Sequence, residues 1–335
     1  MRIDDISSIR KGALKMNIKR RLGQSDIMLS PLGVGTWQFS NKGGTWNTVT
    51  DKTVYEILKY SLTNGMNWID TAEIYGNGIS ETLIGQALKQ LETEKALTDI
   101  PYIADKCFPL LRTADTITKT INQRLDCLQK PVIDLYQIHQ PTSLSSLKEQ
   151  IRHMAELADK GIIKNVGISN FTAQGMRKAD KLLREHGLRL ASNQVKYNLL
   201  HRKPEKNGVI ETAKELGISI IAYSPLQQGM LTGRFHTNPA ATDNISLLRR
   251  FHSGISRKNI ERTRPLIDTL NRLGEKYQKT PAQISLNWLI YSQGELVFAI
   301  PGATKLEQAQ SNIKAQSFRL SQDDIELLNK VSENI

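Results

Sequence analysis

Four side chains of this sequence could together reduce a carbonyl group. Asp70, Lys106 and His139 each stand where a short apolar run ends, and Tyr75 follows Asp70 by five residues. A carbonyl that accepts a hydride also needs a proton, and a tyrosine hydroxyl, with an ordinary pKa of about 10, is a weak donor unless a cation lowers that pKa. The Lys106 ammonium would supply this charge, Asp70 would hold the ammonium, and a His139 nitrogen would orient the carbonyl.

Each of these residues taken alone also has an ordinary structural interpretation. An aspartate at a strand end commonly caps a helix, and a buried lysine beside an aspartate is commonly structural. A loop tyrosine usually packs, and a strand-terminal histidine is usually a satisfied core residue. Their occurrence at the ends of successive apolar runs favours the chemical interpretation, because active sites of parallel barrels lie at the carboxyl ends of the strands.

The elements that must position these residues repeat from residue 31 onwards. Short apolar runs predict strands at 32–36, 68–70, 101–106, 133–138, 165–168, 191–195, 218–222 and 296–300. Amphipathic stretches predict helices at 51–64, 79–91, 113–128, 144–160, 172–186, 206–216, 259–276 and 281–291. Eight alternating units predict an α/β fold of the closed (β/α)8 type, the TIM barrel. The alternative is an open doubly wound sheet, whose Gly-x-Gly-x-x-Gly turn is incomplete at both Gly33-Val34-Gly35 and Gly76-Asn77-Gly78.

Segments outside the repeats predict further features. Residues 1–15 are expected to form a flexible N-terminal extension, and residues 16–335 a single barrel domain. Residues 18–29 predict a β-hairpin, and residues 321–331 predict a capped C-terminal helix. The connection 224–258 is rich in Gly, Ser, Thr and Asn, which predicts a long functional loop over the barrel mouth.

Composition and charge narrow the functional classes. Lys and Arg number 45 against 33 Asp and Glu, so the formal net charge is +12. The basic residues are scattered and no zinc-finger or RNA-binding motif occurs, which disfavours nucleic acid; a dinucleotide phosphate explains the charge equally well. No apolar run approaches the ~20 residues of a membrane span, and no signal segment is evident. Two cysteines, Cys107 and Cys127, allow no disulfide framework, so we expect a cytoplasmic protein without a metal.

A series of short motifs runs in order from about residue 17 to the C-terminus. The motifs are Gly33-Val34-Gly35-Thr36-Trp37, Asp70-Thr71-Ala72-Glu73-Ile74-Tyr75-Gly76, Ser80-Glu81-Thr82-Leu83-Ile84-Gly85, Asp134-Leu135-Tyr136-Gln137-Ile138-His139, Gly167-Ile168-Ser169-Asn170-Phe171, Asn193-Gln194-Val195-Lys196-Tyr197-Asn198, Ala222-Tyr223-Ser224-Pro225-Leu226 and Ile300-Pro301-Gly302-Ala303. In order and spacing they resemble the aldo-keto reductase family. The sequence looks most like its plant and cyanobacterial-type branch, which includes pyridoxal-reductase-like proteins.

The resemblance implies reduction of an aldehyde or ketone with NADP(H), and a catalytic tetrad of Asp70, Tyr75, Lys106 and His139 with Tyr75 as the general acid. It also implies a set of cofactor-binding residues. These are Thr36 and Trp37 near the reacting centre, Ser169, Asn170 and Gln194 at the carboxamide, Tyr223 stacked on the nicotinamide, Ser224, Pro225, Leu226, Gly229 and Arg234 over the pyrophosphate, and Gly302, Ala303, Thr304, Lys305, Gln308 and Asn312 around the adenosine. Without the resemblance, Gln194 would equally be an ordinary buried amide and Tyr223 a packing residue.

Some positions depart from the family pattern. Gln140 follows the tetrad histidine where many relatives have tryptophan or arginine, which predicts a more polar substrate wall. The residue after Gly302-Ala303 is Thr304, with the basic residue one place later at Lys305, and Ser311 replaces an acidic residue that can contact adenosine. Lys305 and Arg234 still supply positive charge, so we expect NADPH to be preferred over NADH.

Three functional alternatives remain open. The same tetrad would serve an oxidative sugar or alcohol dehydrogenase. A cofactor-binding regulatory subunit is a second alternative, against which the intact tetrad argues. A barrel isomerase without a cofactor is the third, and a failure to bind nicotinamide dinucleotides would favour it.

Overall fold

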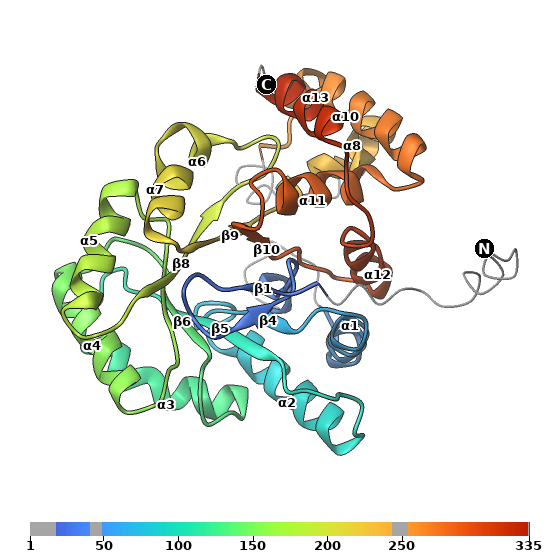
Figure 1. Ribbon diagram of the computed structural model, residues 1–335. Helices are drawn as coiled ribbons and strands as arrows, with labels where there is room; N and C mark the ends of the chain where they lie inside the picture. The colour runs from blue at the N-terminus through green and yellow to red at the C-terminus, as the bar shows by residue number, and fades with distance from the viewer. Residues whose placement is uncertain (1–17, 41–48, 243–253, 334) are drawn as a thin grey trace, which may run out of the picture.

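The computed structural model describes residues 18–40, 49–242, 254–333 and 335 (Figure 1). The extension predicted for residues 1–15 lies outside these residues. Within the described part of the chain, eight parallel strands form one sheet in sequence order: β3 (Val34–Gly35), β4 (Trp68–Asp70), β5 (Tyr102–Cys107), β6 (Leu135–Ile138), β7 (Val166–Ser169), β8 (Leu190–Lys196), β9 (Ser219–Tyr223) and β10 (Val297–Ala299). Parallel bridges Leu32–Ala299 and Gly35–Gly302 join the two ends of the sheet. The predicted strands and the (β/α)8 fold are therefore confirmed.

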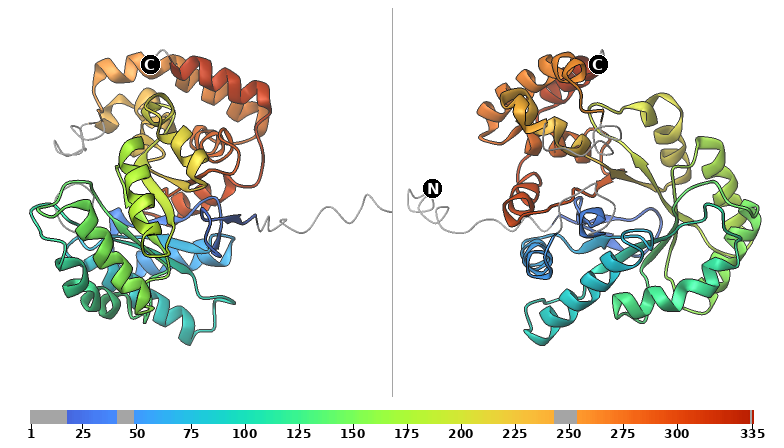
Figure 2. Two further views of the ribbon diagram at one scale, coloured as in Figure 1. Left: turned by 60° about the vertical axis from the view of Figure 1, so that its left-hand side comes forward. Right: turned by 180° about the vertical axis from the view of Figure 1, so that it is seen from behind.

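Helices between the strands cover the outside of the sheet, as the views from the side and from behind show (Figure 2). They are α1 (Asp51–Thr63), α2 (Ile79–Thr93), α3 (Thr116–Leu128), α4 (Leu147–Asp159), α5 (Ala173–Arg184), α6 (Lys203–Lys206), α7 (Val209–Leu216), α10 (Arg257–Tyr277) and α11 (Pro281–Tyr291). Each longer helix turns an apolar face inward; α4, for example, buries Ile151, Met154 and Leu157. The helix expected at 206–216 needs correction. The helix there is α7, and α6 is a separate helix that ends at Lys206, because Gly208 adopts a left-handed φ of 80° between them.

The N-terminal hairpin closes the amino end of the barrel. Its strands β1 (Arg20–Arg21) and β2 (Met28–Leu29) pair antiparallel, as predicted. Leu22, Ile27 and Leu29 pack against an apolar layer inside the barrel that includes Trp68 and Phe298. The hairpin therefore fills the end of the barrel opposite the carboxyl ends of the strands, where the site lies.

The C-terminal segment adds helices outside the ring. α12 (Leu306–Lys314) follows β10, and α13 (Gln322–Glu333) packs beside α10 (Figure 2). The Ser321 hydroxyl accepts a hydrogen bond from the Asp324 N–H, which confirms the predicted cap. No described helix is long and apolar enough to cross a membrane.

The connection after β9 is more structured than a long loop. Its described part contains η3 (Gln227–Thr232), α8 (Arg234–Thr237) and η4 (Pro239–Thr242); a similar turn, η2 (Trp37–Ser40), follows β3. Met230, Phe235 and Ala241 form a small apolar cluster with Ile255 and Ile260. This cluster gives short helical turns a packing partner, which they need because isolated short helices are unstable.

Candidate active site

The four predicted catalytic residues meet at the carboxyl end of the barrel, where β4, β5 and β6 bring them together. Asp70 ends β4, Lys106 lies on β5, and His139 directly follows β6. Tyr75 lies on the loop after β4, and its N–H donates to the Ala72 carbonyl. In the parallel register Asp70 lies opposite Ala104, two residues before Lys106, and Lys106 lies opposite Gln137, two residues before His139. All three residues thus gather at the carboxyl ends of neighbouring strands, as the strand-end argument predicted.

Lys106 is fully buried and paired inside the barrel. Its Nζ lies 2.6 Å from Asp70 Oδ1 and donates a second hydrogen bond of 2.6 Å to the Thr71 carbonyl. Gln194 Nε2 donates to the other oxygen of Asp70 at 2.7 Å, and Gln137 Nε2 lies 3.5 Å from it. Burial works to lower the pKa of Lys106, but Asp70 and the other neighbouring groups outweigh burial and raise it. Lys106 is therefore a permanent cation at physiological pH.

Tyr75 and His139 lie next to this ion pair. Lys106 Nζ is 5.2 Å from the centroid of the Tyr75 ring, and the rings of Tyr75 and His139 are perpendicular at 6.0 Å. Burial raises the pKa of Tyr75 to about 12, although Lys106 acts to lower it. Burial and the Lys106 charge lower the pKa of His139 to about 3. At neutral pH the tyrosine thus keeps its proton and the histidine is uncharged, so both can donate a hydrogen bond.

The residues predicted to hold the carboxamide lie beside the tetrad. Asn170 Nδ2 donates to the hydroxyl of Ser169 at 3.1 Å and to the His139 carbonyl at 3.3 Å. The Tyr223 hydroxyl donates to Asn170 Oδ1 at 3.1 Å, and the Ser169 hydroxyl donates to the Gln194 carbonyl. The amide nitrogen of Gln194 is already committed to Asp70, so its oxygen remains as the group that could accept a bond from a carboxamide.

The remaining predicted cofactor residues lie after β9 and β10, which are adjacent strands. Ser224 and Gly229 both have positive φ, and Ser224, Pro225 and Leu226 lead into η3. Arg234 is exposed at the start of α8. Lys305 is the N-cap of α12 and makes no capping side-chain bond, while the Thr304 N–H and hydroxyl both donate to Gln308 Oε1. Exposed cations, a hydroxyl and a helix N-terminus form a donor set that fits a phosphate-bearing cofactor.

Other predicted residues are less accessible. Thr36 is fully buried, and its hydroxyl donates to the Asp70 carbonyl at 2.8 Å. Asn312 is buried in α12, and Gly302 is bridged to Gly35. Trp37 begins η2, directly after the buried Thr36.

The structure adds site residues that the sequence argument did not single out. The Thr71 carbonyl and the Gln137 amide complete the surroundings of Lys106 and Asp70. The Phe108 ring stands perpendicular to His139 at 5.7 Å, and Glu73 contacts the loop that carries Phe108. Gln137 could have been found from strand alternation, because it lies two residues before His139. No comparable sequence pattern indicated that Phe108 or Glu73 belongs to the site.

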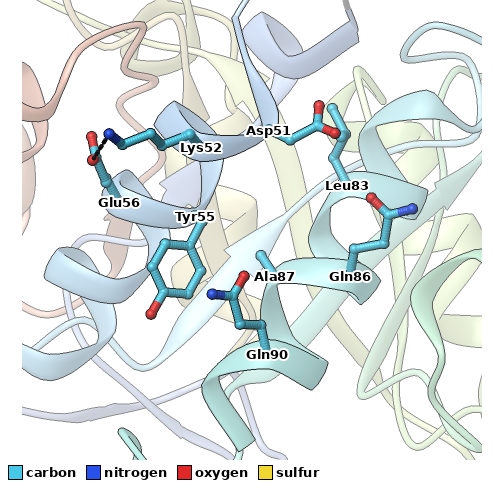
Figure 3. A pocket seen from close by; sticks show the side chains of 8 residues that line it. All are labelled: Asp51, Lys52, Tyr55, Glu56, Leu83, Gln86, Ala87 and Gln90. Carbon is cyan, nitrogen blue, oxygen red and sulfur yellow. Dashed lines mark ion pairs between the residues drawn. The ribbon is translucent and has the colours of Figure 1, made fainter. Parts of the chain in front are cut away.

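A groove outside the barrel shares no residue with this site. It lies between α1 and α2, has a volume of about 490 Å³, and is lined mainly by polar side chains such as Asp51, Lys52 and Gln90 (Figure 3). Because it contains none of the paired groups found at the barrel mouth, we assign the chemistry to the mouth. Among the described residues, no group of three His, Cys, Asp or Glu side chains is placed to hold a metal ion.

Comparisons with known proteins agree with this architecture. The sequence model of the Aldo/keto reductase family matches residues 31–333. The chloroplastic pyridoxal reductase of Arabidopsis thaliana is 30% identical over 316 residues, covering 91% of this chain and 84% of that protein. The NADH-specific methylglyoxal reductase of Escherichia coli is 28% identical over 332 residues, covering 93% and 97%. The crystal structure of the thermostable aldo-keto reductase Tm1743 with the inhibitor epalrestat superposes with a TM-score of 0.74 at 30% identity, covering 94% and 99% of the two chains.

Proposed function

Because this chain belongs to the aldo/keto reductase family, it is an oxidoreductase of carbonyl compounds, and we propose that it reduces an aldehyde or a ketone to the alcohol with NADPH, using Tyr75 as the general acid. The observation that carries the proposal is the buried Asp70–Lys106 pair, whose ammonium lies beneath the ring of a protonated tyrosine. This arrangement suits a proton transfer at a developing oxyanion.

Each tetrad residue has one task in this reaction. A nicotinamide dinucleotide, when bound, would supply the hydride that the carbonyl carbon accepts. The Tyr75 hydroxyl would give its proton to the carbonyl oxygen. The Lys106 charge stabilises the tyrosinate that is left, and Asp70 keeps that charge in place. Neutral His139 donates a hydrogen bond to the same oxygen and so fixes the direction of the carbonyl.

The cofactor residues divide into two groups. Ser169, Asn170 and the Gln194 oxygen would hold the carboxamide, with Tyr223 against the ring. The turn after β9 and the start of α12 would hold the phosphates, and Lys305 and Arg234 would favour the extra phosphate of NADPH. The methylglyoxal reductase of Escherichia coli is NADH-specific, so the preference of this chain for NADPH over NADH is to be measured. We also propose a cytoplasmic location, since Cys107 and Cys127 are free thiols.

A fluorescence titration would test the proposal directly. NADPH and NADH are titrated into the protein with its four tryptophans as reporters, and NADPH oxidation is then followed with pyridoxal and 4-nitrobenzaldehyde. Tighter binding of NADPH with turnover of an aldehyde is the expected result. Binding without turnover of any carbonyl would count against reduction and favour the oxidative or regulatory alternatives. Failure to bind either dinucleotide would overturn the cofactor assignment.

A further inference from the structure

Glu73, which lies between Asp70 and Tyr75 in the sequence, carries a buried carboxylate whose partners lie on the loop after β5 and on α3. Its Oε1 accepts hydrogen bonds from the Phe108 N–H and from Arg112 Nη1, the latter at 2.5 Å. The same Arg112 nitrogen donates to the Phe108 carbonyl at 3.1 Å. Glu73 and Arg112 together therefore hold the backbone of Phe108 on both sides of its side chain.

The backbone and second oxygen of Glu73 bind to further parts of the site. Its N–H donates to the Lys106 carbonyl at 3.2 Å, and its carbonyl accepts the Gly78 N–H at 3.0 Å. Oε2 lies 3.3 Å from Arg124 Nη1 of α3. Only 7% of the Glu73 side chain is exposed, so water and dissolved ions weaken these ion pairs little. One residue thus joins the Tyr75 loop, the Lys106 strand and the Phe108 loop.

Arg112 extends this connection to the loop that follows β6. Its carbonyl accepts hydrogen bonds from the Leu144 N–H at 3.0 Å and from the Ser143 hydroxyl at 2.9 Å. His139 lies at the start of that loop. The loop that carries Phe108 and the loop that carries His139 are therefore both hydrogen-bonded to the Glu73–Arg112 ion pair.

Phe108 is the residue of this hydrogen-bonded network that contacts the tetrad, through His139. Its ring stands at 84° to the His139 ring, with centroids 5.7 Å apart, and Tyr75 makes a similar contact at 81°. Two aromatic rings thus border the imidazole, whose Nδ1 is buried and has no hydrogen-bond partner among the described residues. The position of Phe108 consequently affects how much water reaches His139.

From these contacts we propose that Glu73 is a positioning residue: its carboxylate fixes Phe108 beside His139 and so forms the apolar wall against which the carbonyl substrate lies. The proposal rests on the proposed function, in which His139 orients the carbonyl. It also specifies a substrate class. Carbonyls with an aromatic or bulky apolar group beside the reacting carbon would contact Phe108 and depend most on Glu73.

The substitution Glu73→Gln tests the proposal, because it keeps the size of the side chain and removes the charge that Arg112 and Arg124 need. With 4-nitrobenzaldehyde we expect KM to rise by about tenfold, kcat to change by less than about threefold, and NADPH affinity to stay constant. A small aliphatic aldehyde should show a smaller rise in KM. Phe108→Ala should reproduce this pattern, and it provides a second test if Glu73→Gln does not fold.

A second readout does not depend on turnover. The protein has six histidines, so the His139 imidazole can be followed by nitrogen NMR and assigned with a His139→Asn variant. Burial holds its pKa near 3, and we expect Glu73→Gln and Phe108→Ala to admit water and move that pKa toward the ordinary value of about 6.5.

Asp324→Asn provides a matched control. Asp324 is similarly buried, with 9% of its side chain exposed, and it binds Lys276 Nζ at 2.8 Å, tying α10 to α13 away from the site. This variant should lower Tm without altering KM or the His139 pKa. Wild-type KM and wild-type His139 titration in both Glu73→Gln and Phe108→Ala would overturn the proposal. A shifted His139 pKa in an enzyme that reduces no carbonyl would instead refute the proposed function and leave the positioning role intact.

Discussion

Two neighbouring residues of β5 carry opposite charges into very different surroundings. Lys106 faces the barrel interior, where the two oxygens of Asp70 accept hydrogen bonds from Lys106, Gln194 and Gln137. Asp105 faces the helices, where its carboxyl group interacts with the carboxyl group of Glu81 on α2. Glu81 Oε1 lies 3.2 Å from Nε of Arg124, which belongs to α3. The interior carboxylate is therefore held by one ammonium and two amides, whereas the two outer acids share the charge of Arg124.

The outer cluster has more acids than bases. It contains the carboxyl groups of Glu73, Glu81 and Asp105 and the guanidinium groups of Arg112 and Arg124. Burial, reinforced by Asp105, raises the pKa of Glu81 to about 10, and burial raises the pKa of Asp105 to about 6. Glu81 therefore keeps a proton at neutral pH, which balances the cluster. Strand β5 thus carries a permanent ion pair on the face where the chemistry takes place. On the face that packs against the helices it contributes to a cluster whose charge depends on protonation.

The largest effect is expected on the interior face, at Tyr75. Tyr75→Phe removes the proposed proton donor while keeping the ring above Lys106, so turnover should fall by about 10³-fold. NADPH affinity should stay constant, because the hydroxyl is not assigned to cofactor binding. Steady-state kinetics and a cofactor titration measure the two quantities. Unchanged turnover would remove Tyr75 from its proposed role.

Breaking the interior ion pair should affect both activity and stability. Lys106→Met leaves Asp70 as a buried charge without its cation, so we expect the free energy of unfolding to fall by about 3–5 kcal/mol. Turnover should fall by about 10²-fold, because the tyrosinate loses its stabilising charge. Adding Asp70→Asn removes the unpaired charge and should restore stability without restoring turnover. Recovery of both by the double variant would show that the pair is only structural.

The two faces were not equally predictable from the sequence. The interior set followed from strand ends alone, because Asp70, Lys106 and His139 terminate apolar runs that parallel pairing brings to one edge. Alternation also predicts that Asp105 points outward. Its partners Glu81 and Arg124, however, come from two helices whose rotation about their axes depends on packing, which the sequence does not specify. The turns after β9 were missed for a similar reason, since their stability comes from tertiary contacts of Phe235.

The outer cluster makes stability depend on pH with a definite sign. The pKa of Glu81 is about 10 in the folded protein, above its ordinary value of 4.5, so folding favours the protonated form. The free energy of unfolding should therefore fall as pH rises from about 4.5 to 10. Glu81→Gln mimics the protonated acid, so this loss should be absent in the variant.

Melting temperatures between pH 5 and pH 10 measure this difference. The Tm of Glu81→Gln should exceed that of the wild type by a margin that grows with pH to several degrees, since about 1 kcal/mol corresponds to roughly 2–4 °C in large domains. Glu307→Gln, a charge removal in the first turn of α12, is the control and should track the wild type at alkaline pH. If the plots of Tm against pH run parallel for Glu81→Gln and the wild type, Glu81 is ionised in the folded protein.

The smallest effect should be the change of kcat for carbonyl reduction with pH. The pKa of Tyr75 is about 12 and that of His139 about 3, so neither group changes its protonation between pH 5 and pH 9. With both substrates saturating, and provided the chemical step limits turnover, kcat should vary by less than about twofold across this interval. The outer cluster should lose stability over the same interval while activity stays level, so the two faces of β5 would respond differently to one variable. A limb in the kcat profile near pH 6.5 would mean that His139 is open to water, and one near pH 9 would mean that Lys106 lowers the pKa of Tyr75 more than burial raises it.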